Sequence, residues 1–314
     1  KKNIHNFAEM VAKKSFRYWC RFAKPGNKRL VMTLLVRDEA DIVRANIEYH
    51  LDHGVDFIIA TDNGSVDGTY QILEKYQKKG VLHLIREEEQ NFAQCEWVNR
   101  MGRIACNQYH ADLIFHCDAD EFWWASSGSL KNELSHRHKV DALDVNVNNM
   151  IFVRTGEMDS FSKSLYYAVT KPLQSTNHGV DSLDRSLFLF KSAGKVIYRT
   201  RNGYLEVGQG NHGIVDPHVS ISQKKSLDIQ IIHYPLRSYG QFERKVLNGG
   251  LAYEKNPSKA GGWQWRRWYE SYKRGELYND YCTLTLDDRE SHKYLNAGVL
   301  SDWLSRHRKI CSYL

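Results

Sequence analysis

The chain has 314 residues, of which 26% are charged and 42% are hydrophobic, a composition typical of globular proteins rather than disordered ones. No apolar run approaches the about 20 residues that a membrane-spanning helix needs, and no apolar stretch of a secretory signal follows the first residues. The net charge of +7 either favours an anionic partner, such as nucleotide phosphates, an anionic membrane surface or nucleic acid, or merely keeps the protein soluble.

Residues 7–24 predict a basic amphipathic helix that ends at Pro25-Gly26-Asn27, with an apolar stripe from Phe7 to Phe22. Such a helix lies either on a membrane surface or against its own domain. We therefore expect residues 1–27 to form a separate N-terminal element. The six cysteines contain no Cys-x-x-Cys pair, which favours a reduced, cytoplasmic compartment, with a peripheral contact to the inner face of the membrane if the helix binds there.

Short apolar runs and helical patterns alternate after residue 28. The expected strands are Leu30–Val36, Val55–Thr61, Val81–Ile85 and Ala111–Cys117, and the expected helices between them are Asp41–His53, 69–79 and 91–110. This alternation predicts an α/β fold with a mostly parallel twisted sheet that is flanked by helices.

Polar side chains follow each of these strands. Arg37-Asp38-Glu39 follows the first strand, Asp62 the second, and Asp118 and Asp120 the fourth. Ligands of open α/β sheets bind beyond the carboxyl ends of the strands, so these side chains are expected to meet at one edge. An Asp-x-Asp pair there offers hard oxygen ligands, which suit Mg²⁺ or Mn²⁺ on phosphates better than zinc, although a bare pair is also compatible with a solvated acidic turn.

The first strand carries no Gly-x-Gly-x-x-Gly and the chain has no P-loop, so NAD chemistry and a glycine cradle for phosphates are disfavoured. Asp62 could instead accept hydrogen bonds from a base or from ribose hydroxyls. Asp67 or Thr69 is expected to cap the following helix.

The second half of the chain predicts a less regular architecture. Asp144–Val153 and Leu227–His233 read as strands, and Lys195–Thr200 with Tyr204–Val207 reads as a hairpin around a glycine turn. From Ser238 onward the chain reads as helical. The Trp263–Tyr269 cluster could pack as core, stack on acceptor sugars or lie at a membrane surface.

Three segments resemble the family 2 glycosyltransferases, in the branch whose metal motif reads Asp-Ala-Asp-Glu-Phe. They are Val-Arg-Asp-Glu-Ala-Asp, Gly-Val-Asp-Phe-Ile-Ile-Ala-Thr-Asp-Asn-Gly-Ser-Val-Asp-Gly-Thr, and Phe-His-Cys-Asp-Ala-Asp-Glu-Phe. The Gly210-Asn211-His212 loop and the segment from Ile232 to Lys245 also fit. The resemblance implies a GT-A fold, with a catalytic domain at 28–235 and a helical extension at 236–314. It also implies transfer of a sugar from a nucleotide-diphosphate sugar to a glycan or lipid-linked acceptor, as in cell-surface or capsular polysaccharide assembly.

The resemblance also implies roles for single residues. Arg37, Glu39 and Asp62 would surround the nucleoside, Asp118 would face the ribose or the metal, and Asp120 would bind Mn²⁺ or Mg²⁺. His212 and His233 are the candidates for an additional metal or phosphate ligand. Gln94 and Asn99, on the helix after the third strand, either reach donor hydroxyls or lie on an exposed helix face.

Family 2 enzymes invert the transferred carbon, which requires a base beside the acceptor hydroxyl. Asp181 and Asp184 lie in the expected acceptor region and are the candidates for this base, and Glu206 and Asp216 remain alternatives.

Three other functions are weighed against this interpretation. A nucleotidyltransferase would need a glycine-rich basic loop after the first strand, which Arg37-Asp38-Glu39 does not supply. A catalytically silent sugar- or membrane-binding module on the same fold remains open. A nucleic-acid binder would explain the positive charge but not the carboxylate edge, so no nucleic-acid partner is expected.

Overall fold

The computed structural model describes residues 28–88, 93–135, 140–154, 161–174, 185–201, 203–215, 222–255 and 263–314. The helix expected at residues 7–24 lies outside these ranges. Its contact with a membrane or with the domain therefore stays a prediction.

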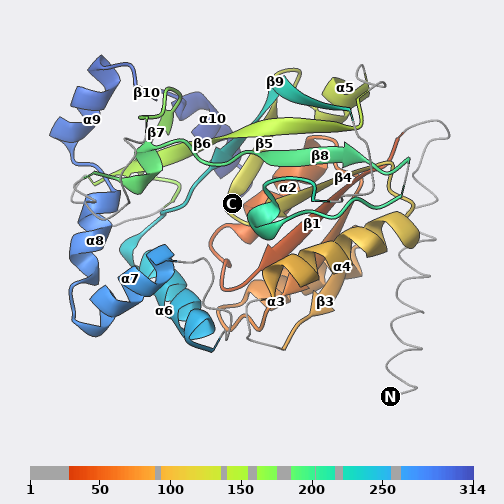
Figure 1. Ribbon diagram of the computed structural model, residues 1–314, viewed down its shortest axis with the longest axis horizontal. Helices are drawn as coiled ribbons and strands as arrows, with labels where there is room; N and C mark the ends of the chain where they lie inside the picture. Colours follow the sequence, from red (N-terminus) through yellow and green to blue (C-terminus); the bar gives the residue numbers. More distant parts are fainter. Residues whose placement is uncertain are drawn as a thin grey trace.

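The expected alternation of strands and helices is confirmed in the first half of the chain. Its elements are β1 (Leu30–Val36), α2 (Val43–Asp52), β2 (Phe57–Asp62), α3 (Thr69–Lys78), β3 (Leu82–Arg86), α4 (Gln94–Asn107), β4 (Leu113–Asp118), β5 (Glu121–Ala125) and α5 (Leu130–Ser135). Strands β3, β2, β1 and β4 lie side by side in this order, and all three pairs are parallel. The predicted α/β fold with a parallel sheet is thus observed (Figure 1).

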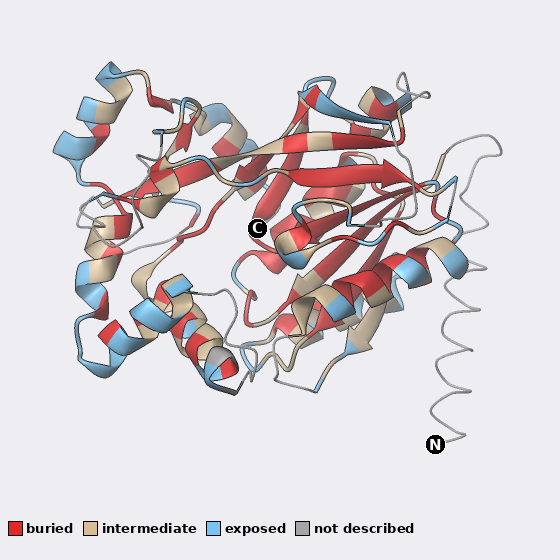
Figure 2. Cartoon of the chain, in the orientation of Figure 1, coloured by how far each residue is buried: buried red, intermediate tan, exposed pale blue. Residues whose placement is uncertain are grey.

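Helices cover both faces of this parallel part because successive side chains of a strand point to opposite faces. Leu30 and Met32 of β1 belong to a core that includes Ile47 of α2. Val31, between them, belongs to a second core that includes Met101 of α4. Figure 2 shows these central strands as almost entirely buried. Their near-continuous apolar sequence follows from burial on both sides.

The second half of the chain extends the same sheet with mostly antiparallel pairs. Its elements are β6 (Ala142–Val153), β7 (Leu165–Val169), the 3₁₀ turn η1 (Leu187–Leu189), β8 (Lys195–Arg199), the 3₁₀ turn η2 (Gln209–Asn211), β9 (Gln223–His233), α6 (Tyr239–Lys255), α7 (Trp263–Lys273), α8 (Leu277–Leu284), α9 (Asp288–Asn296), β10 (Leu300–Ser301) and α10 (Leu304–Cys311). In the described residues the sheet has ten strands, with the main order β10-β7-β6-β8-β4-β1-β2-β3, and β9 lies between β5 and β6.

The hairpin predicted for Lys195–Thr200 and Tyr204–Val207 is wrong. Strand β8 pairs with β4 on one side and with β6 on the other, so neither edge is available to a neighbouring hairpin strand. The turn itself forms, since Gly203 donates its N–H to the carbonyl of Thr200 at 2.8 Å. The segment after the turn packs on α4 instead, where the Asn99 side chain binds the backbone of Val207.

Helices α6, α7, α8 and α9 gather at the left of Figure 1, whereas α10 packs on β7 and α2. Helices α6 and α7 approach closely at Gly250 of α6. A Cβ at this position would lie 2.2 Å from the Tyr269 ring of α7. Among the described residues, no helix combines the length and the apolar character that a membrane span requires. The domain boundary expected near residue 235 stays a prediction.

Candidate functional site

The carboxyl ends of the parallel strands meet at one edge of the sheet, as their register requires. Leu35 of β1 lies opposite Asp118 of β4, and Val36 lies opposite Asp62 of β2. A cavity of about 370 Å³ opens beside this edge. Six of the predicted site residues line it: Arg37, Glu39, Gln94, Asp118, Asp120 and His233.

A buried asparagine shapes the turn between β4 and β5 that carries the two aspartates. The Asn46 side chain of α2 donates to the carbonyls of Ala119 at 3.1 Å and of Glu121 at 2.7 Å. Asn46 is fully buried, so its contacts hold the turn rigidly against the helix. Asp118 and Asp120 are therefore presented by a braced turn.

Asp118 is ion-paired with a buried lysine. Lys195 of β8 places its Nζ 2.7 Å from Asp118 and 2.8 Å from Glu121, and its side chain is only 2% exposed. Burial opposes the charge on Lys195, but the two carboxylates outweigh it and raise the pKa of the ammonium group. Burial raises the pKa of Glu121 to about 8, although Lys195 counteracts this shift. The lysine thus holds the Asp118 side chain in place.

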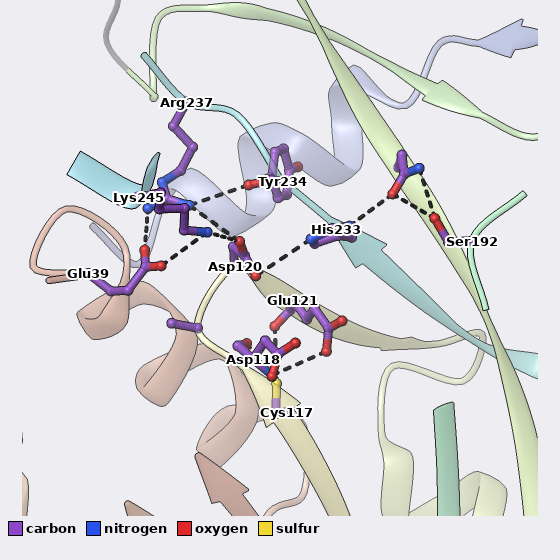
Figure 3. Close-up of polar contacts among 12 residues, drawn as sticks. Glu39, Cys117, Asp118, Asp120, Glu121, Ser192, His233, Tyr234, Arg237 and Lys245 are labelled. Atoms are coloured by element: carbon purple, nitrogen blue, oxygen red, sulfur yellow. Dashed lines mark hydrogen bonds and ion pairs between the residues drawn. The ribbon is translucent and has the colours of Figure 1, made fainter. Parts of the chain in front are cut away.

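Asp120 lies in a second cluster of charges, which Figure 3 shows on the other side of the turn. Lys245 of α6 lies 2.5 Å from Asp120 and 3.2 Å from Glu39. The fully buried Arg237 contacts Glu39, lies 2.7 Å from Asp41 and lies 3.8 Å from Asp120. Burial opposes ionisation of Asp120, yet the cations Lys245 and Arg237 lower its pKa well below the usual range. Burial raises the pKa of Glu39 despite its two cationic neighbours.

The orientation of His233 follows from its hydrogen bonds. The Asn149 side chain of β6 donates from Nδ2 to the Phe188 carbonyl at 2.9 Å, so its Oδ1 faces His233. That oxygen lies 2.9 Å from His233 Nδ1, which must carry the proton of this hydrogen bond. Burial lowers the pKa of His233 to about 4, so the ring is neutral near pH 7. The lone pair of Nε2 therefore faces Asp120 Oδ1 across 3.7 Å.

Asp62 does not line the cavity, but it lies at the same edge. One of its oxygens accepts the N–H of Ser65 at 3.1 Å. The other oxygen is buried and has no hydrogen-bond partner among the described residues. Burial raises the pKa of the carboxyl above its usual value, although Ser65 counteracts this shift. An unpartnered buried carboxylate oxygen is costly unless a ligand supplies a donor.

Asp38, which follows the first strand, has a structural role. Its backbone is left-handed, with a φ of 54°, a conformation that aspartate and asparagine tolerate better than most residues. Its carboxylate accepts the N–H of Val66 at 2.8 Å and the amide of Asn248 at 2.7 Å. Asp38 therefore joins the loop after β2 to α6.

Two predicted donor residues on α4 differ in position. Gln94 lines the cavity and accepts a hydrogen bond from Gln209 at 2.8 Å. Asn99 does not line the cavity, and its amide contacts the N–H of Val207 at 3.0 Å and the carbonyl of Val207 at 3.1 Å. The donor-binding role expected for Asn99 stays a prediction.

The other candidates lie at the margin of the site or outside the described residues. His212, beside η2, is exposed and lies 3.1 Å from the Gly194 carbonyl through Nδ1, and it does not line the cavity. Glu206 is ion-paired with Arg103 at the surface. Asp181, Asp184 and Asp216 lie outside the described residues, so the identity of the base stays a prediction.

Sequence reasoning assigned no role to several residues that complete the site: Asn46, Asn149, Lys195, Arg237 and Lys245. No local pattern marks Asn46, Asn149 or Lys195, since each reaches the site from a distant element. Part of the Trp263–Tyr269 cluster packs as core, which was one of its three expected environments; contact with acceptor sugars or with a membrane stays a prediction. Trp268 is buried in the core, and Trp265 packs against the core while also lining the cavity.

Comparison with known proteins provides a family match. Residues 31–277 match the sequence model of glycosyltransferase family 92. The comparison with curated proteins found no match.

Solved structures with a similar chain path include TarS from S. aureus and glucosyl-3-phosphoglycerate synthase from Mycobacterium tuberculosis. TarS 1-349 is 15% identical, with a TM-score of 0.36 over 72% of this chain and 65% of that one. The longer TarS structure is matched over only 39% of its length. The synthase, in complex with Mn²⁺, UDP and glucosyl-3-phosphoglycerate, is 16% identical with a TM-score of 0.28, over 43% of this chain and 51% of that one. Likenesses of this strength carry no argument about ligands.

Proposed function

The chain belongs to glycosyltransferase family 92, and we propose that it transfers a sugar from a nucleotide-diphosphate sugar to a hydroxyl of a glycan or lipid-linked acceptor, with inversion and with a divalent metal. The finer assignment to the family 2 branch, inferred from the motifs, is not confirmed by this match. The roles that follow rest on the chain's own residues.

The contact between Asp120 and His233 carries the proposal. A carboxylate oxygen of Asp120 and the Nε2 atom of His233 lie 3.7 Å apart. The low pKa of His233 and the hydrogen bond of its Nδ1 to Asn149 leave Nε2 without a proton near pH 7. Two electron-rich atoms in this arrangement are stabilised by a cation. Asn149 holds the ring, as the outer partners of metal-binding histidines usually do.

The donor set suits Mg²⁺ or Mn²⁺. Within the described residues, no three acidic, histidine or cysteine side chains already form a complete metal site. Such ions are commonly bound through one or two carboxylates together with substrate phosphates and water. Asp120 and His233 would hold the metal, with Asp118 beside them, and the bound ion would offset the negative charge that develops on the leaving diphosphate.

Positively charged side chains at the cavity supplement this role. Arg37 lines the cavity, and its Nε is buried without a hydrogen-bond partner among the described residues. Its guanidinium group is suited to a phosphate oxygen of the donor. Glu39 lines the same cavity, but both of its oxygens are ion-paired with Arg237 and Lys245, so it positions these cations rather than the nucleoside. Asp62 lies at the same edge with one buried oxygen that has no partner among the described residues, and this oxygen is proposed to accept a hydrogen bond from the nucleoside.

Transfer with inversion is a single displacement. The acceptor oxygen attacks the anomeric carbon, the bond to the diphosphate breaks, its electron pair leaves with the diphosphate oxygen, and a carboxylate takes the acceptor proton. Asp181 and Asp184 remain the candidates for that carboxylate.

Nucleotide binding tests the proposal directly. The melting temperature of the wild-type chain is measured with UDP, GDP, CDP and dTDP, each with and without Mn²⁺. A ligand that binds the native state raises the melting temperature by mass action. We expect one nucleotide to raise it only when Mn²⁺ is present, and that nucleotide identifies the donor.

Matched variants connect this effect to the site. Asp120→Asn and His233→Gln, each compared with its own melting temperature without ligand, are expected to lose the metal-dependent shift. Asp288→Asn on α9, whose side chain is 85% exposed, is the control and should keep it. A wild-type chain that responds to none of the eight conditions would contradict the proposal and favour the silent module.

A further inference from the structure

A second, smaller cavity lies beside the edge of β6 that faces β8 and β7, at the point where the pairing along this edge is interrupted. Strand β8 pairs with β6 up to Val145, and β7 begins to pair at Met150. Residues 146–149 lie between these two partners, and a cavity of about 190 Å³ opens there. This volume is smaller than that of typical drug-sized sites, so it suits a single small ring.

The lining of this cavity is polar and positively charged. The amides of Asn146 and Asn148, the ring of Phe190, and Lys191, Ser192 and Lys225 contribute to it. No carboxylate of the described residues lines the cavity, and neither lysine has an ion-pair partner within the described chain. Amides and hydroxyls hydrogen-bond to the hydroxyls of a sugar, while the two lysines favour an anionic group.

The second cavity lies next to the first. Asn149 lines the second cavity, while its Oδ1 contacts His233, which lines the first. Its Nδ2 donates to Ser192 at 3.0 Å, and Figure 3 shows the resulting series of contacts from Asp120 through His233 to Ser192. Phe188 lines the first cavity and Phe190 the second, so one segment contributes to both.

We propose that this second cavity binds the acceptor, through a sugar unit that carries a carboxylate, phosphate or sulfate group. This inference rests on the proposed function, because only a transferase has an acceptor. The binding of the acidic sugar can nevertheless be measured separately from transfer. The enzyme would then extend an acidic glycan, with the acidic unit held by Lys191 and Lys225 while a neighbouring hydroxyl enters the first cavity.

The test uses direct binding. The probes are an oligogalacturonate hexasaccharide, a heparin-derived hexasaccharide, mannose 6-phosphate and, as a neutral comparison, maltohexaose, each titrated into the full chain by calorimetry. We expect at least one anionic probe to bind, and maltohexaose to bind more weakly. The Lys191→Met/Lys225→Met double variant should weaken the anionic probe by about tenfold or more, since hydrogen bonds to charged groups are among the stronger ones.

Two controls make the outcomes distinguishable. Lys224→Met makes the same charge change as Lys225→Met at the adjacent exposed residue, which does not line the cavity, and should leave the affinity unchanged. The melting-temperature shift with nucleotide and Mn²⁺ is measured in every variant and should persist.

The inference is overturned if none of the three anionic probes binds, or if the double variant does not weaken the binding. A nucleotide shift that persists in that case leaves the proposed function intact. Anionic binding that depends on the two lysines in a chain without any nucleotide shift supports the cavity and contradicts the transferase.

Discussion

At the scale of single residues, the site is organised by cations that face its carboxylates. Lys195 holds Asp118, and Lys245 holds Asp120 at 2.5 Å. Lys195 is buried, whereas the Lys245 side chain is 25% exposed and lines the cavity. A metal that binds Asp120 must therefore compete with Lys245.

This competition predicts the behaviour of Lys245→Met. A partly exposed ion pair is worth up to about 1 kcal/mol, which corresponds to about fivefold in affinity. We expect Mn²⁺ alone to stabilise the variant at about fivefold lower concentration than it stabilises the wild type, as measured by melting temperature during a Mn²⁺ titration. Lys273→Met on α7 is the control, because it removes an exposed ion-paired lysine outside the site. It should not change the midpoint of the Mn²⁺ titration. An unchanged or higher midpoint in Lys245→Met would show that the lysine does not compete for the metal position.

At the scale of elements, close approaches of helices to loops place the parts of the site. Helix α4 is joined to the segment after β8 through Asn99 and through the ring of Tyr204, whose hydroxyl donates to Asn99. A Cβ on Gly102 would lie 2.1 Å from this ring. Glycine is thus required in the middle of α4 by packing, against its low helix propensity.

Two opposing effects decide the outcome of Gly102→Ala. Alanine gains about 1 kcal/mol of helix propensity, but overpacking costs about 1–3 kcal/mol. Because the Tyr204 ring is held by its hydrogen bond, we expect overpacking to dominate and the free energy of unfolding in urea to fall. Gly240→Ala near the start of α6, where the nearest atom lies 3.8 Å away, is the matched control and should be neutral or stabilising. A more stable Gly102→Ala variant would contradict the close approach of α4 to Tyr204.

At the scale of the whole molecule, buried neutral histidines couple the fold to pH. Burial lowers the pKa of His50 and His116 to about 3 and of His233 and His307 to about 4. The unfolded chain takes up these protons near the ordinary histidine pKa of about 6.5, whereas the folded chain does not. For these four groups the unfolded state binds more protons between pH 6.5 and 4, so their contribution to stability falls as the pH falls. Glu121 acts in the opposite direction, because its raised pKa lets the folded state bind one proton more, but four histidines outweigh one carboxyl group.

We expect the free energy of unfolding, measured by urea denaturation, to decrease steadily from pH 7 to pH 4.5. Each histidine contributes at most about 1.4 kcal/mol per pH unit. His116→Gln should reduce the slope, because it removes one of the four groups, whereas His292→Gln at an exposed position of α9 should not. Stability that stays constant or rises on acidification would contradict the burial of these rings as neutral groups.

Local pattern in the sequence was sufficient for the four parallel strands and the three helices between them, although not for β5 and α5. Strand β1 has the predicted bounds, and the alternation of strands with helices predicts parallel pairs whose carboxyl ends meet, which brings Asp62 and Asp118 to one edge. These features depend on hydrophobic periodicity and on chain order, both of which are properties of neighbouring residues. The Asp118–Asp120 turn was recognisable for the same reason.

Tertiary structure alone decided which side chains complete the site. Lys195 reaches Asp118 only because β8 inserts between β4 and β6, the same insertion that makes the predicted hairpin impossible. Asn149 orients His233 because β6 and β9 pair in parallel, and Asn99 contacts Val207 because a distant loop packs on α4. Contacts between elements far apart in the chain depend on strand order and packing, which no local periodicity encodes.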